Sequence, residues 1–412
     1  MFSRVTLVEY SNSRLVIHFN IYYNSLRHTI KLFKQNEVKS AKGSAEMRGI
    51  MAEINYHEQV DIDNAVKLRS LLATLPRFCK DFFRGIEPTT SSRTRIAYAY
   101  DLRIFFDFLA KSNPLIKNTP ITELRVDILD EIMPLDIEEY LDYLSYYNAD
   151  GKKYMNKENG KKRKLVALRS FYNYYYKKQI IRTNPPSLVN IPKLHEKEIV
   201  RLEIDEVARL LDEVESGDAL TKKQQVFHEK TKLRDLAIMT LLLGTGIRVS
   251  ECVGLDINDV DFENNGIKII RKGGNEVVIY FGDEVRDALL EYLEERKQLV
   301  PATGHENALF LSMQMKRLNV RSVENLVKKY ASTVTKLKTI TPHKLRSTYG
   351  TSLYRETGDI YLVADVLGHK DVNTTKKHYA ALEDSRRRQA AKVVKLREER
   401  MTMNLTGQSK VQ

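Results

Sequence analysis

The sequence predicts a mainly α-helical protein with a small antiparallel β-sheet in its C-terminal half. Apolar residues recur at three- and four-residue spacing over residues 97–112 and 164–181, which is typical of amphipathic helices. Residues 265–281 instead alternate around a Gly-Gly turn, as the two strands of a hairpin do. With 412 residues, the chain is long enough for two domains with separate cores.

The N-terminal segment, residues 1–55, lacks this patterning. Its second half, around "KSAKGSAEMRGIMAE", is rich in small residues and has no helical period, so we expect a disordered arm. Met47 and Met51 stand just before the first clear helical pattern. Translation from either of them is therefore an alternative to translation from Met1.

Residues 60–185 are expected to form a bundle of amphipathic helices. The lysine-rich stretch 148–164 is predicted as a loop, and it either contacts DNA phosphates or is simply a solvated surface. The aromatic residues of "SFYNYYYKK" are expected to pack in the core on one helix face, because base stacking is a feature of single-strand binding.

A second domain is expected over residues 202–385, after an extended linker at 186–201 that contains Pro186 and Pro192. A basic tail, residues 386–412, follows it. The patterns predict six elements in this domain: a capped helix over 203–214, an apolar helix from 232 to Gly244, the hairpin of 265–281, and helices over 285–299, 322–334 and 342–358.

Composition narrows the class of protein. No run of about 18 apolar residues occurs, so we expect neither a membrane span nor a secretory signal, and place the protein in the cytoplasm. Cys79 and Cys252 lack metal-ligand spacing, which argues against zinc and against a disulfide framework. A net charge of +13 and a pI near 9.3 are typical of proteins that bind polyanions, although such a balance also serves solubility alone.

Four short segments of the second domain carry candidate functional groups. "GTGIRVSE" places Arg248 after two glycines and Glu251 three residues later, and it is not a P-loop because no Lys-Ser/Thr pair follows. "RKGGNE" places Lys272 at the tip of the predicted hairpin. Taken singly, an arginine at a helix start is usually a surface or salt-bridging residue, and a lysine at a hairpin tip is normally explained by the polarity of the turn.

The other two segments each contain a histidine. "PHKLRSTYG" places His343 and Arg346 on one face of a helix, where they could form a structural pair. "LGHK" places His369 after a glycine, a position that often caps a helix. Further on, "HYAAL" contributes His378 and Tyr379.

Together these residue types suit phosphoryl transfer. Two arginines can clamp the non-bridging oxygens of a pentavalent phosphoryl transition state with paired hydrogen bonds. A lysine and histidines can transfer protons, and a tyrosine hydroxyl can act as nucleophile when cations favour its deprotonated form. The sequence contains no acidic cluster for magnesium, so we expect a mechanism without a metal or other cofactor.

In this order, "GTGIRVSE", "RKGG", "HKLR", "LGHK" and "HYAAL" resemble the catalytic domain of the tyrosine recombinases, the phage integrase and Xer (XerC/XerD-like) group. The resemblance covers about residues 202–382, and the preceding helices resemble the family's core-binding domain more loosely. It implies a helical core-binding domain followed by a tyrosine-recombinase catalytic domain. It also implies double-stranded DNA as partner and a homo-tetramer on paired sites, joined through C-terminal segments, with accessory factors in some systems.

The resemblance also implies a role for each candidate. Arg248 and Arg346 would clamp the scissile phosphate, with Glu251 as a supporting acid. Lys272 would be the general acid for the leaving 5′ oxygen, and His343 would assist in proton transfer. His369 would donate a hydrogen bond to the phosphate, and Tyr379 would be the nucleophile. The expected product is a 3′-phosphotyrosyl bond that a partner strand can reseal.

The sequence departs from the family pattern at two places. Ser347 stands where many members have a further histidine, and Tyr379 follows His369 by ten positions, one more than in many Xer-type members. In the shorter register His378 would take the place of the nucleophile, but a phenol is needed there, so Tyr379 is the prediction.

Two alternative functions stay open on the sequence. One is a non-catalytic DNA-binding or architectural protein of the same fold, and the other is a type IB topoisomerase-like nicking and closing enzyme. Within the recombinase hypothesis, integration or excision of a mobile element and Xer-type dimer resolution have equal weight.

Overall fold

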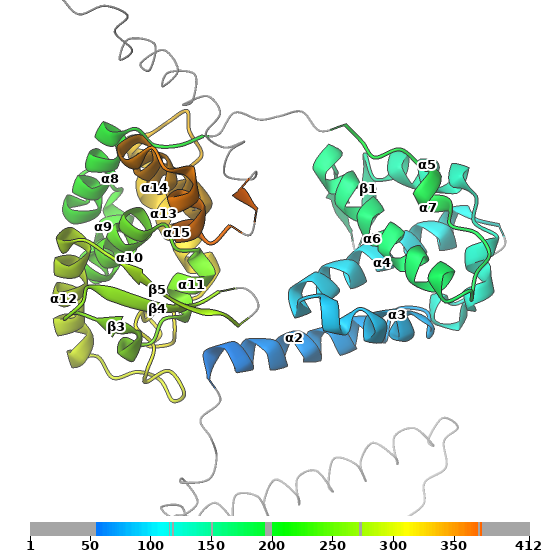
Figure 1. Cartoon of the computed structure of the whole chain (residues 1–412), viewed down its shortest axis with the longest axis horizontal. Coiled ribbons are helices and arrows are strands. Elements are labelled where there is room, and N and C mark those ends of the chain that lie inside the picture. Colours follow the sequence, from blue (N-terminus) through cyan, green and yellow to red (C-terminus); the bar gives the residue numbers. More distant parts are fainter. Residues whose placement is uncertain are drawn as a thin grey trace, which may run out of the picture. The chain divides into compact units, whose positions relative to one another are not determined.

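The computed structural model describes residues 55–114, 116–117, 119–149, 151–193, 200–271, 274–369 and 371–372 (Figure 1). The expected N-terminal arm and C-terminal tail lie outside these residues, apart from Asn55. The mainly helical fold with small antiparallel sheets is confirmed. We describe the helical part (residues 55–193) and the C-terminal part (residues 200–372) separately. No helix within the described ranges has the length and apolar character needed to cross a membrane.

The helical part contains five main helices, as the apolar spacing predicted. Ser91 caps the longest of them, because its hydroxyl accepts a hydrogen bond from the backbone N–H of Thr94. One 3₁₀ helix precedes this helix, and two follow it before the next α-helix. The helices are α2 (Tyr56–Leu72), α3 (Cys79–Gly85), α4 (Ser92–Ser112), α5 (Pro134–Tyr143) and α6 (Glu158–Lys177).

The core of the helical part is aromatic. Phe82 and Phe171 meet edge to face with ring centroids 5.1 Å apart, and Phe105 packs on Tyr140 in the same way at 5.2 Å. Tyr175 is buried too, and its hydroxyl donates to the Phe78 carbonyl. The prediction that the aromatic residues of α6 face the core is therefore confirmed for Phe171, Tyr172 and Tyr175, whereas it is wrong for Tyr176, which is 48% exposed.

Two segments of the helical part differ from the sequence prediction. The lysine-rich stretch is not only a loop: β1 (Tyr147–Ala149) and β2 (Lys152–Tyr154) form an antiparallel hairpin there, and α6 begins at its end. The predicted linker begins with a short helix, α7 (Pro185–Leu188), because proline is well tolerated in the first turn, where an N–H has no intrahelical partner. The middle of the predicted linker, residues 194–199, lies outside the described residues.

The C-terminal part has the predicted order of helices and strands. Its sheet is antiparallel in the order β3–β4–β5, and Ile267 lies opposite Ile279 in the hairpin. The helices that match predictions are α8 (Ile204–Ser216), α10 (Lys232–Thr245), α12 (Asp283–Gln298), α13 (Val320–Val334) and α14 (Pro342–Thr357). The strands are β3 (Val260–Asp261), β4 (Gly266–Ile270) and β5 (Glu276–Tyr280).

Three short helices of the C-terminal part were not predicted. They are α9 (Lys222–His228), α11 (Val249–Gly254) and α15 (Ile360–Leu367). Each has eight residues or fewer, so its apolar residues do not complete enough turns to show a period.

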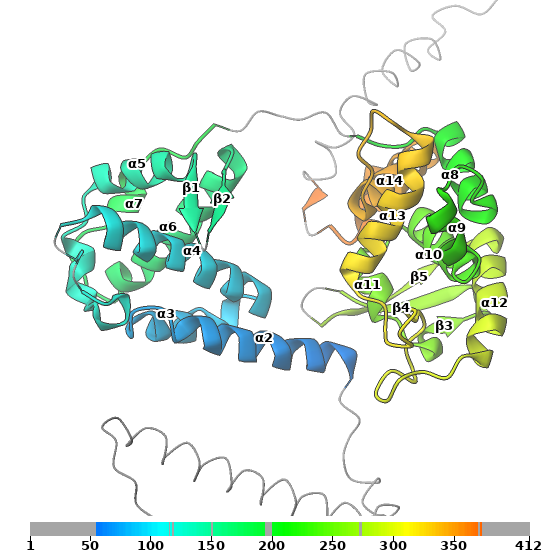
Figure 2. The ribbon, with the colours of Figure 1, turned by 180° about the vertical axis from the view of Figure 1, so that it is seen from behind.

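Helix α10 lies at the centre of the C-terminal part and packs against α8, α12 and α14 (Figure 2). The prediction that it ends at Gly244 is wrong by one residue. Gly244 is still helical, and a Cβ there would lie 2.5 Å from Val285 Cγ2 of α12. The left-handed residue that ends the helix is Gly246, with φ 62°, because only glycine adopts that conformation without strain.

Candidate active site

Arg248 stands at the start of α11, directly after the turn that ends α10. Its backbone N–H donates to Glu251 Oε2 at 2.7 Å, and its Nη1 donates to Glu251 Oε1 at 2.8 Å. The Glu251 side chain is only 4% exposed, whereas that of Arg248 is 37% exposed. The buried carboxylate therefore holds a half-exposed guanidinium in place by a charge-assisted pair.

Arg346 lies on α14 and is buried, with 5% exposure. Its Nη1 donates to the Gly246 carbonyl at 2.6 Å, and its Nη2 donates to the Leu367 carbonyl. The first contact ties α14 to the turn before Arg248, and the second ties it to the end of α15. A buried arginine held by backbone carbonyls keeps its full positive charge, since arginine does not lose its proton in proteins.

His343 occupies the first turn of α14, three residues before Arg346, and is exposed. Residues at this spacing are neighbours on a helix surface, so the two side chains share a face of α14.

His369 follows the end of α15, and two glycine-dependent contacts fix its backbone. Gly368 adopts a left-handed conformation with φ 62°, and its N–H donates to the Asp365 carbonyl at 2.8 Å. The N–H of His369 then donates to the Ala364 carbonyl at 2.8 Å. This is the hydrogen-bonded end that glycine permits after an α-helix, and it leaves His369 half-buried.

The backbone carbonyls of Asp365–Gly368, which we call the α15 carbonyl turn, receive hydrogen bonds from three arginines. Arg248 Nη2 donates to Gly368 O at 3.2 Å, and Arg346 donates to Leu367 O. Arg271, which follows β4, donates to the carbonyls of Asp365 and Val366. Three cations from separate elements thus gather where a helix presents its negative end.

The fold therefore brings together four of the residues that the sequence singled out: Arg248, Glu251, Arg346 and His369. Lys272, His378 and Tyr379 lie outside the described residues. Arg271 was missed, although it immediately precedes Lys272 in "RKGGNE". No local pattern distinguishes an arginine that reaches a distant helix end from one that is solvated.

Tyr349 is a phenol that lies near Arg346 among the described residues. A Cβ on Gly246 would lie 2.4 Å from its Cδ1, so the ring packs directly on the turn to which Arg346 is bound. Burial raises the pKa of Tyr349 above its ordinary value, which disfavours the phenolate. Its environment suits packing rather than nucleophilic attack.

The described ranges contain no group of His, Cys, Asp or Glu side chains that could hold a metal ion. Cys252, next to Glu251, is fully buried, and burial raises its pKa to about 12. The charged groups at the α15 carbonyl turn are arginines, whose planar forks match phosphate oxygens. The arrangement can bind and polarise a phosphodiester with side-chain cations.

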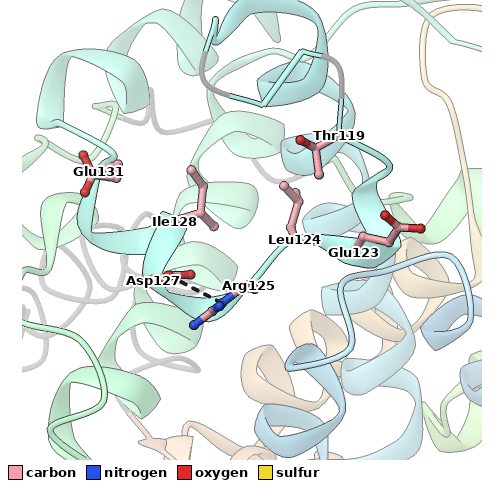
Figure 3. A pocket seen from close by; sticks show the side chains of 7 residues that line it. All are labelled: Thr119, Glu123, Leu124, Arg125, Asp127, Ile128 and Glu131. Carbon is pink, nitrogen blue, oxygen red and sulfur yellow. Dashed lines mark ion pairs between the residues drawn. The ribbon is translucent and has the colours of Figure 1, made fainter.

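A hollow in the helical part has the opposite character (Figure 3). Carboxylates dominate its charged side chains, and its one arginine, Arg125, is paired with Asp127 at 3.6 Å. Such a lining repels phosphate, so this hollow does not compete with the arginine site for DNA. It is lined by Thr119, Glu123, Leu124, Arg125, Asp127, Ile128 and Glu131.

The sequence is similar to those of known proteins over most of its length. Residues 200–386 match the phage integrase family. The tyrosine recombinase XerC of Caldanaerobacter subterraneus subsp. tengcongensis is 34% identical over 306 residues, which are 73% of this chain and 81% of that relative. The tyrosine recombinase XerD of Staphylococcus epidermidis is 31% identical over 295 residues, covering 71% of this chain and 90% of that relative.

Solved structures share the fold. A XerH site-specific recombinase bound to palindromic difH substrate is 22% identical, with a TM-score of 0.56 over 73% of this chain and 79% of that chain. The Tn1549 transposon integrase in complex with circular intermediate DNA is 21% identical, with a TM-score of 0.54 over 76% of this chain and 98% of that chain.

The solved structures share the helix-rich fold, and the two relatives described above are both named tyrosine recombinases. The chain belongs to the tyrosine recombinase family. The resemblance seen in the sequence is confirmed, and so is the enzyme class, a site-specific recombinase. The non-catalytic and topoisomerase-like alternatives are not favoured.

Proposed function

We propose that the chain cuts and rejoins double-stranded DNA at specific sites through a 3′-phosphotyrosyl intermediate formed on Tyr379. One observation carries the proposal: Arg248 and Arg346, from α11 and α14, converge on the turn that carries His369. Elements distant in the sequence thereby bring two guanidinium groups to the backbone turn that precedes His369, and two guanidinium groups are what a phosphate clamp requires.

In the proposed reaction Tyr379 Oη attacks the scissile phosphorus. A P–O bond to tyrosine forms while the bond from phosphorus to the 5′ oxygen breaks. Lys272 Nζ gives a proton to that leaving oxygen, and His343 assists in removing the proton of the tyrosine hydroxyl. Arg248, Arg346 and His369 bind the non-bridging oxygens, and Glu251 keeps Arg248 oriented.

The energy of the broken phosphodiester is kept in the phosphotyrosine. A 5′ hydroxyl of a partner strand can therefore attack it, release Tyr379 and reseal the DNA without ATP. Exchange of both strand pairs requires two duplexes, and we propose a homo-tetramer that brings two sites together. The XerH recombinase is bound to difH substrate and the Tn1549 integrase to circular intermediate DNA, which supports DNA as the partner of this chain.

We further propose that residues 60–185 form the core-binding domain and residues 202–385 the catalytic domain, with the protein acting in the cytoplasm. Two biological roles remain part of the proposal with equal weight. The relatives named XerC and XerD support dimer resolution, whereas the similarity to a transposon integrase supports movement of a mobile element.

A covalent-capture experiment tests the proposal. The purified chain is incubated with nicked duplexes drawn from DNA that flanks its own gene, denatured in detergent and separated on a gel. A protease-sensitive shifted band is expected for the wild type and for His378→Ala, and no band for Tyr379→Phe, which keeps the ring and removes only the attacking oxygen. Sequencing of the captured DNA then maps the site.

Three results would contradict the proposal in different ways. Loss of the adduct in His378→Ala but not in Tyr379→Phe would show that His378, and not Tyr379, is the nucleophile. Relaxation of supercoiled DNA that lacks any captured site would favour the topoisomerase-like activity. Binding that does not weaken as salt rises would speak against DNA as the partner, because lysines and arginines on phosphates release counterions.

A further inference from the structure

Arg271 links the base of the β4–β5 hairpin to the end of α15. Its Nη1 donates to the Asp365 carbonyl at 3.2 Å and its Nη2 donates to the Val366 carbonyl at 2.6 Å. The guanidinium lies directly on Gly368, where a Cβ would stand 2.4 Å from Nη1 and 2.6 Å from Cζ. Any side chain at position 368 would displace it.

The backbone of Arg271 is fixed as well. Its N–H donates to the Asn275 carbonyl at 2.9 Å, and its carbonyl accepts from the Gly274 N–H at 3.0 Å. The side chain therefore starts from a hydrogen-bonded position at the end of a strand. A side chain that starts from a fixed backbone can hold its target in place.

The target is the α15 carbonyl turn. The last carbonyls of an α-helix have no intrahelical partner and form its negative end, so a cation there stabilises them. Arg271 donates hydrogen bonds to two carbonyls of this turn, while Arg248 and Arg346 donate to one each. In the proposed reaction Arg248 and Arg346 must also bind the phosphate. The side-chain hydrogen bonds that Arg271 makes with the described residues, by contrast, all go to the α15 carbonyl turn.

We propose that Arg271 is a positioning residue for strand cleavage: it holds the α15 carbonyl turn, and with it His369, against Arg248 and Arg346 while these two arginines bind the phosphate. The inference rests on the proposed function, because it assigns His369 to the phosphate. It adds a residue that touches neither the DNA nor the reacting atoms. A hydrogen-bonding group misplaced by about 1 Å can slow an enzyme about 100-fold, so such a support has a kinetic effect.

The experiment compares Arg271→Ala with Lys268→Ala, which removes one positive charge from the same hairpin. Lys268 is half-exposed, and its ion pairs among the described residues are with Asp259 at 3.9 Å and Glu276 at 4.0 Å, neither of which belongs to α15. The substrate is a duplex that carries the captured cleavage site, and the rate of adduct formation is measured in a single turnover. We expect Arg271→Ala to slow it about 10- to 100-fold with DNA affinity unchanged within about threefold, and Lys268→Ala to change it less than about twofold.

A double-mutant cycle with His369→Ala separates positioning from general damage. If Arg271 acts through His369, Arg271→Ala should slow the His369→Ala enzyme less than about threefold, because the group that it positions is already gone. Arg271→Lys keeps a charge and one hydrogen bond, so an intermediate rate is expected, and it serves as the test if Arg271→Ala does not fold. Melting temperatures of all variants identify any loss of folded protein.

The outcomes distinguish the two proposals. If the wild type forms no adduct, the proposed function fails and this inference fails with it. If the wild type forms the adduct and Arg271→Ala is as fast, or if its full effect persists in the His369→Ala background, the positioning role is overturned while the proposed function stands.

Discussion

Each part of the molecule buries one aspartate beside an arginine and a lysine, and the two sites differ in what else they hold. Asp101 in the helical part and Asp235 in the C-terminal part are both 1% exposed. Asp101 is paired with Arg163 at 2.7 Å and lies 3.7 Å from Lys164 Nζ, which follows Arg163 on α6. Its partners thus join two helices, α4 and α6.

Asp235 accepts more hydrogen bonds and joins more elements. Arg234 Nη2 donates to it at 2.6 Å, Lys329 Nζ at 3.1 Å, Tyr330 OH at 3.0 Å and Thr231 Oγ1 at 3.1 Å. The Tyr330 hydroxyl lies 3.0 Å from a ring nitrogen of a buried histidine on α9. One carboxylate thereby connects α10 to α13 and, through Tyr330, to α9.

The difference shows how the two parts are stabilised. The helical part has an aromatic core, and its buried ion pair links two of the helices that form that core. The C-terminal part is tied together by polar contacts between elements, as at Asp235, Glu251 and Arg346. A site that must hold several cations at fixed positions needs such contacts, because apolar packing does not orient a charge.

The largest expected effect is that of Asp235→Ala. Removal of this carboxylate takes an acceptor from two partly buried cations and a buried phenol, which should lower the free energy of unfolding of the C-terminal part by about 3–5 kcal/mol. Urea unfolding followed by far-UV circular dichroism measures it. Asp205→Ala is the matched control: its side chain is 73% exposed and pairs with Arg209 on the surface, so a loss below about 0.5 kcal/mol is expected. Equal losses would show that the buried carboxylate of Asp235 stabilises the C-terminal part no more than a surface one.

Next in size is Glu251→Gln, which removes the charge of the carboxylate that orients Arg248 while keeping its shape. A charge-assisted hydrogen bond is roughly twice as strong as a neutral one, so Arg248 loses its fixed position. Adduct formation should slow at least about tenfold with little change in DNA affinity. Glu276→Gln, an exposed residue of β5, is the control and should leave the rate unchanged. A wild-type rate in Glu251→Gln would show that apolar packing alone positions Arg248.

Asp101→Asn should lower the free energy of unfolding by a smaller amount, about 1 kcal/mol at neutral pH. Burial raises the pKa of Asp101 above its ordinary 3.8, against the opposing effect of Arg163 and Lys164. The folded state therefore binds more protons than the unfolded state just above pH 3.8, and the contribution of this group to stability falls as pH rises through that window. Unfolding free energies measured across this range should show the penalty of Asp101→Asn shrinking as pH rises. A growing penalty would mean that the two cations outweigh burial.

The smallest effect concerns the cysteines, one in each part. Cys79 and Cys252 are fully buried, and burial raises the pKa of both thiols. Neither should react with a disulfide reagent at pH 8 in the native protein, because the thiolate is the reactive form. The rates at which the two thiols react with this reagent can also be compared in the variants. In Asp235→Ala, Cys252 should react faster than Cys79. The reverse order would place the weaker structure in the helical part.

Sequence patterns predicted the helices and strands that are long enough for their apolar residues to repeat with a regular period. The helices α8, α13 and α14 and the hairpin of β4 and β5 were found because their side chains repeat over several turns or alternate along the strand. The hairpin of β1 and β2 was missed because strands of three residues show no alternation, and α7 was missed because its prolines indicated an extended chain. The short helix α15, which orders the site, gave no signal either.

The sequence by itself determined the family of this protein and the set of side chains proposed for its reaction. Arg248, Glu251, Arg346 and His369 are recognisable as a set because the type of a side chain and its order along the chain do not depend on folding. Only the tertiary structure decided that three arginines meet at the α15 carbonyl turn. Arg271 reaches carbonyls 94 and 95 positions away, and such contacts arise from the packing of whole helices and strands. A backbone carbonyl is the same in every residue, so no pattern in the sequence marks the ones that an arginine will bind.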